Sequence, residues 1–121
     1  MSVGPQPDIQ RIDDVTVVSF DPTVQSINES YLSHSSEALL SVVNAQPPRV
    51  VLDMAGVKFF NSSFIEILFR IWNRVQSTNG RFAICNLDPY CLEVLQVTNL
   101  TTLWTIVDSR DAALAAVRSA A

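Results

Sequence analysis

The sequence predicts one α/β domain, built on a mixed but mostly parallel sheet of about four to five strands with about four helices packed against it. From residue 28 onward, short apolar segments alternate with helical segments, which is typical of layered α/β folds. Two of the apolar segments, Val50–Leu52 and Arg81–Cys85, suit central strands that helices cover on both faces. We expect the domain to span residues 9–121, after a loose lead-in over residues 1–8 that contains one glycine and two prolines.

The N-terminal part predicts a hairpin and then a helix. Val15–Phe20 is short and rich in β-branched residues, as strands are, and Ile9–Ile12 is expected to pair with it across a two-residue turn. Residues 28–44 carry apolar side chains at helical spacing. Either Asn28 or Ser30 is suited to cap this helix at its N-terminus.

The middle of the chain predicts a strand, a helix and a second strand. The segment Gln46-Pro47-Pro48 should stop the first helix, because a residue that precedes proline disfavours helical backbone. Val50–Leu52 follows as a buried strand. A helix is expected over about residues 63–77, and Gly80 follows its end. Arg81–Cys85 is then the second buried strand.

The C-terminal part predicts two further helices with one strand between them. A proline in the first position suits the start of a short helix over residues 89–97. Trp104–Val107 is the last strand. A terminal helix is expected over residues 109–120, with Ser109 as its cap and Asp111 favourable to its dipole.

The charge balance argues against a nucleic-acid partner, and the short apolar runs argue against insertion into a membrane. The net charge is −4 and the pI is about 4.7, whereas a nucleic-acid binder needs a basic surface to neutralise phosphates. Arg70, Arg74 and Arg81 are too few and too scattered to form such a surface. No apolar run approaches the roughly 20 residues of a membrane span, and residues 1–14 do not resemble a signal peptide. We therefore expect a cytoplasmic protein that does not insert into a membrane.

The residue types present favour no catalytic chemistry. The chain has three glycines, too few for a P-loop or a dinucleotide fingerprint. We recognise no nucleophile–histidine arrangement of catalytic type and no paired acid and base in the sequence. Cys85, Cys91 and His34 do not have the spacing of a zinc site, and two cysteines are too few for a disulfide framework. We expect two reduced, mostly buried thiols and a protein without enzyme activity, metal or cofactor.

Two serines stand at the expected start of the second helix. Ser62 and Ser63 follow a buried strand and a loop that begins at Asp53. Serine hydroxyls at a helix N-terminus accept hydrogen bonds from the exposed N–H groups, so one interpretation is that the pair only caps the helix. The other interpretation is a regulatory site, and the residues by themselves leave both open.

An ordered series of segments resembles the STAS domain family of anti-sigma factor antagonists. The run from Asp53 through Ser63 is similar to the family's signature, in which a strand, a polar turn and a serine pair open a helix. The resemblance covers about residues 9–118 and is strongest after residue 49. The other segments that resemble the family are Gly80–Leu87, Glu93–Leu95, Asn99-Leu100, Leu103-Trp104, Val107–Ser109 and Ala112–Leu114.

The resemblance implies a STAS-like fold and a function in protein binding. Family members bind an anti-sigma factor, which is often also a serine kinase, and so release a sigma factor. The kinase phosphorylates a serine at a helix start, which switches binding off, and a serine phosphatase reverses the modification. Carried onto this sequence, the phosphorylated residue is Ser63, with Ser62 as the fallback. The identity of the partner and the oligomeric state stay open.

Two positions differ from the family's usual pattern and support an alternative. Asn61 stands where the family often has aspartate, and Phe64 stands where it often has glycine. The alternative is a STAS binding subunit that is not phosphorylated. Such a subunit would belong to a lipid transporter ATPase or to a larger signalling assembly.

The helix after the serine pair predicts a docking surface. Its apolar residues cover an arc of roughly 200°, which is wider than the stripe of about 100° that packing on one side requires. One edge is therefore either exposed for a partner or covered by a neighbouring helix. If it is exposed, the partner-binding residues are Asn61, Ser62, Ser63, Phe64, Ile67 and Ile71.

Overall fold

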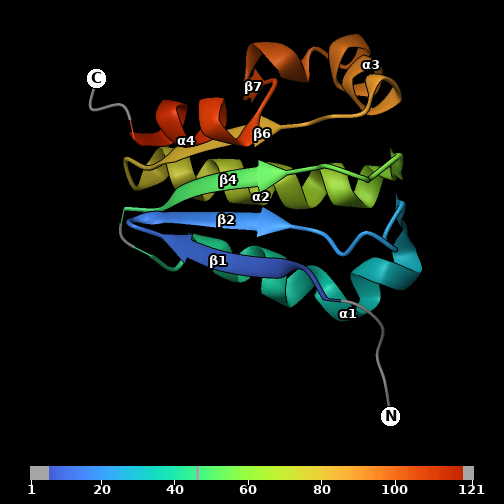
Figure 1. Ribbon diagram of the computed structural model, residues 1–121, viewed down its shortest axis with the longest axis horizontal. Helices are drawn as coiled ribbons and strands as arrows, with labels where there is room; N and C mark the ends of the chain where they lie inside the picture. Colours follow the sequence, from blue (N-terminus) through green and yellow to red (C-terminus); the bar gives the residue numbers. More distant parts are fainter. Residues whose placement is uncertain (1–5, 46, 119–121) are drawn as a thin grey trace.

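A mixed five-stranded sheet forms the centre of the computed structural model, which describes residues 6–45 and 47–118 (Figure 1). The strand order is β1-β2-β4-β6-β7, in which β1 runs antiparallel to β2 and the other neighbours are parallel. This sheet confirms the predicted fold class. The strands are β1 (Asp8–Ile12), β2 (Val15–Ser19), β4 (Arg49–Asp53), β6 (Arg81–Cys85) and β7 (Thr105–Val107).

Helices cover both faces of this sheet. In Figure 1, α1 and α2 lie behind the sheet and α4 lies in front of it. The two strands that were predicted to be central are interior, since β4 lies between β2 and β6, and β6 lies between β4 and β7. The helices are α1 (Glu29–Leu40), α2 (Ser62–Ser77), α3 (Pro89–Val97) and α4 (Arg110–Arg118), with the 3₁₀ turns η1 (Ser41–Val43) and η2 (Leu100–Thr102).

Alternation along the buried strands sorts their side chains into two cores. In β4, Val50 and Leu52 belong to the larger core with α1, α2 and α3, whereas Val51 belongs to the smaller core with α4. In β6, Phe82 and Ile84 point into the larger core in the same way. A strand that is buried on both faces has no polar side to alternate with, which is why both strands stand out as apolar runs.

A second, two-stranded sheet was not anticipated from the sequence. β3 (Ser26–Ile27) and β5 (Phe59–Phe60) pair in parallel. Strands of two residues are too short to produce a recognisable alternation. Each of them leads directly into a helix, β3 into α1 and β5 into α2. The small sheet therefore brings the beginnings of these two helices together.

Most element boundaries agree with the predictions. The hairpin joins β1 and β2 by pairing Ile12 with Val15, and Asn28 is the N-cap of α1. The first helix ends earlier than predicted, at Leu40, and the chain continues through η1. The predicted stop at Gln46, the lead-in over residues 1–5 and the end of the terminal helix at residues 119–121 lie outside the described residues. Residue 8, which was assigned to the lead-in, is already part of β1.

All helices are short compared with a membrane span. α2 has 16 residues, whereas a helix that crosses a bilayer needs about 20 apolar residues. In residues 6–45 and 47–118, none of the helices combines the length and the apolar character that such a crossing requires.

Candidate functional site

The predicted site lies where α1 and α2 begin side by side. Both helices start at the same end of the molecule because the strands that lead into them, β3 and β5, are parallel. Asn28 caps α1 by accepting a hydrogen bond from the backbone N–H of Tyr31 at 3.0 Å. Asn61 caps α2 in the same way, accepting from the backbone N–H of Phe64 at 3.0 Å. The partial positive charges of two helix N-termini therefore lie close together.

The serine pair does not cap α2, which corrects the interpretation that Ser62 or Ser63 does so. Asn61 holds the cap position in extended backbone, and asparagine is as good an N-cap as serine. Ser62 and Ser63 are instead the first two residues of the helix. Ser62 is exposed and Ser63 is partly buried, so neither hydroxyl is required to begin the helix.

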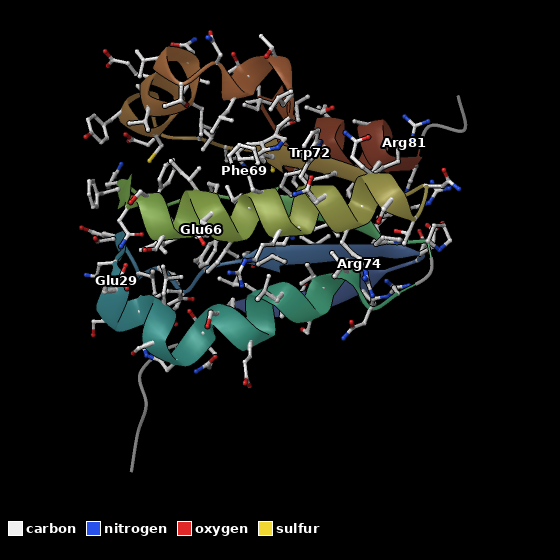
Figure 2. The ribbon with its side chains drawn as sticks, turned by 180° about the vertical axis from the view of Figure 1, so that it is seen from behind. Glu29, Glu66, Phe69, Trp72, Arg74 and Arg81 are labelled. Carbon is white, nitrogen blue, oxygen red and sulfur yellow. The ribbon has the colours of Figure 1, made fainter. Side chains whose placement is uncertain are left out.

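Ser63 is joined to the neighbouring helix through Glu29. The hydroxyl of Ser63 donates a hydrogen bond to Glu29 Oε1 at 2.5 Å, and Asn61 Nδ2 donates to the same oxygen at 3.1 Å. Glu29 lies in the first turn of α1, at the end of the molecule where α2 also begins (Figure 2). Sequence reasoning missed Glu29 because 34 positions separate it from Ser63. The only local signal was an acidic residue directly after a good cap.

A shallow groove extends from this contact between α1 and α2. Its volume is about 330 Å³, and Glu29, Ser63 and Ile67 are among the residues that line it. Glu66 and Arg70 also line the groove and form an exposed ion pair at 3.6 Å. Figure 2 shows Glu29 and Glu66 on the two helices that flank the groove. The hydroxyl of Ser63 therefore lies in a surface whose nearest charged neighbour is a carboxylate.

The apolar edge of α2 is not exposed, so the prediction of a docking surface there is wrong. Phe64, Ile67 and Ile71 are 0%, 8% and 2% exposed. All three belong to the larger core, in which Phe64 packs against the rings of Phe20 and Phe60. The sheet covers α2 on one side and α1 covers it on another, which accounts for its wide apolar arc. Phe64 therefore adds no bulk at the surface beside the serines.

An exposed aromatic pair begins at Phe59, three residues before Ser62. Phe59 of β5 is 42% exposed and stacks on Tyr90 of α3, which is 52% exposed, with 6.3 Å between the ring centroids. Next to them, Lys58 and Asp88 form an ion pair at 3.5 Å. Exposed aromatic side chains are enriched where proteins bind one another. The sequence did not indicate this pair, because it depends on β5 and α3 lying side by side.

A buried polar cluster holds the end of β4. Asp53 is 5% exposed. Its carboxylate accepts hydrogen bonds from Arg110 Nε at 2.9 Å, Asn86 Nδ2 at 3.0 Å and the backbone N–H of Ala55 at 3.1 Å. Burial raises the pKa of Asp53, but these hydrogen bonds together outweigh burial and hold the pKa below its ordinary value of 3.8. The cluster fastens the end of β4 and the loop after it to α4.

Both cysteines are free and buried, as predicted. Burial raises the pKa of the Cys85 thiol to about 12 and that of the Cys91 thiol to about 11. Both therefore stay protonated near neutral pH, and a protonated thiol is a poor nucleophile and a poor metal ligand.

One family model matches most of the chain. The STAS domain model matches residues 6–113. Among curated proteins, BtrV of Bordetella bronchiseptica, described as a candidate anti-sigma factor antagonist, is 24% identical over 112 residues. The match covers 93% of this chain and 94% of BtrV.

Solved structures of similar proteins share the fold. An anti-sigma-factor antagonist (STAS) domain protein from Planctomyces limnophilus is 38% identical, with a TM-score of 0.89. The match covers 94% of this chain and 99% of that chain. An anti-sigma factor antagonist from Mycobacterium paratuberculosis is 24% identical, with a TM-score of 0.82 and 98% of each chain covered. At 24% identity, the similarity to the Mycobacterium paratuberculosis protein shows that the two chains share a fold.

Proposed function

This chain belongs to the STAS domain family, and on that basis we propose that it is an anti-sigma factor antagonist, a regulatory protein of the cytoplasm rather than an enzyme. Its partner would be an anti-sigma factor, and binding would release a sigma factor from that partner. The main support is the 38% identity to the Planctomyces limnophilus anti-sigma-factor antagonist (STAS) domain protein over nearly the whole of both chains. The likeness to BtrV supports the same function.

The observation that carries the regulatory part of the proposal is the position of Ser63. It is the second residue of α2. Its hydroxyl does not cap the helix, because Asn61 is the N-cap. A serine kinase would transfer the γ-phosphoryl group of ATP to Ser63 Oγ, forming a new P–O bond, breaking the P–O bond to ADP and releasing the hydroxyl proton to water. The phosphate carries about −1.5 to −2 charges at neutral pH. A helix N-terminus tolerates such an anion, so the modified domain should stay folded.

The phosphate would act on the partner instead of on the fold. A partner surface that fits a neutral hydroxyl would meet a hydrated dianion at Ser63. Burying that charge without a counter-charge costs on the order of several kcal/mol, which is enough to abolish a modest affinity. The buried side chains of Phe64, Ile67 and Ile71 would support the docking surface from below. The surface itself would consist of Asn61, Ser62 and Ser63 with the exposed Phe59 and Tyr90.

Incubation with the cognate kinase and ATP tests the modification site by mass spectrometry. We expect one added phosphate, on Ser63, and no phosphate on the Ser63→Ala variant. Ser62→Ala is the matched control and should be modified normally, because it leaves the neighbouring hydroxyl in place. Undiminished phosphorylation of Ser63→Ala would move the site to Ser62 or elsewhere.

Capture of partners before and after phosphatase treatment tests the function. We expect the dephosphorylated protein to retain an anti-sigma factor and the phosphorylated protein to lose it. Capture of a transport ATPase in both states would contradict the proposal. That result would support the alternative of a STAS subunit that is not regulated by phosphate.

A further inference from the structure

Two neighbouring loops carry the exposed aromatic pair. Asp53 and Cys85 are the last residues of β4 and β6, and they lie opposite each other in the parallel register. The loop after β4 leads to Phe59, and the loop after β6 leads to Tyr90. The two rings stack with 6.3 Å between their centroids. Their relative position therefore depends on how the two loops are joined.

One carboxylate oxygen joins these two loops. Asp53 Oδ1 accepts a hydrogen bond from the backbone N–H of Ala55 at 3.1 Å and another from Asn86 Nδ2 at 3.0 Å. Ala55 belongs to the loop after β4, whereas Asn86 belongs to the loop after β6. The other oxygen, Oδ2, accepts from Arg110 of α4. Asp53 is buried, and hydrogen bonds to an ionised acceptor are stronger than those between neutral groups.

We propose that Asn86 and Asp53 are positioning residues for the docking surface, because their hydrogen bond holds the exposed aromatic pair in one arrangement before the partner binds. This inference rests on the proposed function. A surface that is already ordered binds more tightly than a mobile one, since less conformational freedom is lost on binding. Asn86 adopts a positive φ of 58°, which asparagine tolerates better than most residues. The backbone turns there, at the end of β6, and the side chain bonds to the neighbouring strand.

Two other polar side-chain contacts between these segments are weaker. Lys58 and Asp88 form an ion pair at 3.5 Å, but the Lys58 side chain is 65% exposed, and exposed ion pairs contribute little. The thiol of Cys91 lies 4.0 Å from the carbonyl oxygen of Val57, and a thiol is a weak donor. The shorter bond to the buried carboxylate of Asp53 is therefore the main polar connection.

Asn86→Gly tests the proposal. Glycine accepts a positive φ without strain, and it removes the side chain that donates to Asp53. We expect the affinity for the anti-sigma factor to fall about two- to tenfold, which is the usual effect of having to order one more side chain on binding. Isothermal titration calorimetry measures the affinity at a temperature at which thermal melts show that every variant is folded.

Asn86→Asp separates the loss of the donor from the flexibility of glycine. Aspartate is nearly the same size and also tolerates a positive φ. Its ionised carboxylate cannot donate a hydrogen bond, and it repels the carboxylate of Asp53. The affinity should therefore fall at least as far as in Asn86→Gly. Wild-type affinity in either variant would overturn the positioning role.

A double variant shows whether Asn86 acts through the aromatic pair. In a Tyr90→Ala background no stack is left to position, so Asn86→Gly should change the affinity by less than about twofold. An undiminished effect of Asn86→Gly in that background would contradict the proposal. Val117→Ala is the control for a general loss of stability, because Val117 is buried in the smaller core with α4. It should lower the melting temperature and leave the affinity unchanged.

NMR of the protein without its partner separates this inference from the proposed function. Nuclear Overhauser effects between the two rings should be present in the wild type and weaker in Asn86→Gly. If no anti-sigma factor binds the wild type but these effects depend on Asn86, the proposed function fails and the connection between the loops stands. If the anti-sigma factor binds but Asn86→Gly changes neither the ring contacts nor the affinity, the function stands and this inference fails.

Discussion

Asn61 shows how one side chain serves both helices at the site. Its oxygen accepts from the backbone N–H of Phe64 and caps α2, while its amide nitrogen donates to Glu29. An aspartate could cap the helix equally well, but it has no hydrogen to donate to a carboxylate. Two carboxylates at this distance would repel each other. The amide at position 61 is therefore what allows Glu29 to lie beside Ser63.

The exposed aromatic pair should matter for binding and not for stability. Phe59→Ala and Tyr90→Ala should each weaken the affinity for the anti-sigma factor about fivefold or more, because truncating an aromatic hot-spot residue costs more than about 1 kcal/mol of binding. Both side chains are already largely exposed, at 42% and 52%, so the melting temperature should hardly change. Isothermal titration calorimetry measures the affinity, and thermal melts check the fold.

A control for these variants lies elsewhere on the surface. Leu103 is 46% exposed and lines a separate pocket with residues of α2, β6 and α4. Leu103→Ala should bind the partner like the wild type. Normal affinity in both aromatic variants would exclude Phe59 and Tyr90 from the docking surface.

Packing on two sides determines what a charge in the middle of α2 does. Ile67 is 8% exposed and lies in the larger core, at the floor of the groove between α1 and α2. Ile67→Glu would bury a carboxylate, and we expect the free energy of unfolding to fall by about 3 kcal/mol. The melting temperature should fall by more than about 10 °C, which differential scanning calorimetry measures directly.

A control substitution for Ile67→Glu is available on the exposed face of α2. Asn73 is exposed on the polar face of α2, so Asn73→Glu should change the stability by no more than about 0.5 kcal/mol. An unchanged melt for Ile67→Glu would contradict the packing described above and would restore this edge as a candidate docking surface.

The elements that could be predicted from the sequence are those whose pattern is local. β4 and β6 stood out because a strand buried on both faces is a continuous apolar run, and α3 begins and ends at the predicted residues, Pro89–Val97. The apolar arc of α2 left open whether its edge is exposed or covered, because the covering helix, α1, is distant in sequence. Ser63 could be placed at a helix start, whereas its contact with Glu29 depends on how two distant helices pack.

The parallel topology places the site at one edge of the whole molecule. β2 and β4 are parallel neighbours, so their carboxyl ends lie together, and the segments that follow them begin α1 and α2 side by side (Figure 1). This edge is where binding sites of α/β sheets commonly lie. Asp53, the last residue of β4, lies at the same edge. The loop that leads to the serines is therefore fastened where it leaves the sheet.

Asp53 ties this edge to the last helix, so its removal should affect the stability of the whole fold. Arg110 of α4 donates to its carboxylate at 2.9 Å across 57 positions of sequence. Asp53→Asn removes the charge and weakens the hydrogen bonds to it. The side chain of Arg110 is 36% exposed and can be rehydrated, so we expect a loss of about 2 kcal/mol near pH 7. Urea unfolding measures this loss.

The pKa of Asp53 gives this loss a pH dependence of defined sign. In the folded protein the pKa lies below the ordinary value of 3.8, so the ionised carboxylate stabilises the fold fully above about pH 4 and less as the pH falls through the folded pKa. Urea unfolding between about pH 7 and about pH 3 should therefore show the wild type approaching Asp53→Asn at the acid end. Asp14→Asn is the matched control, because Asp14 forms an exposed ion pair with Arg49 at 3.5 Å and should contribute less than about 1 kcal/mol. A constant difference between the wild type and Asp53→Asn over this range would show that the ionised form of Asp53 is not what holds the cluster.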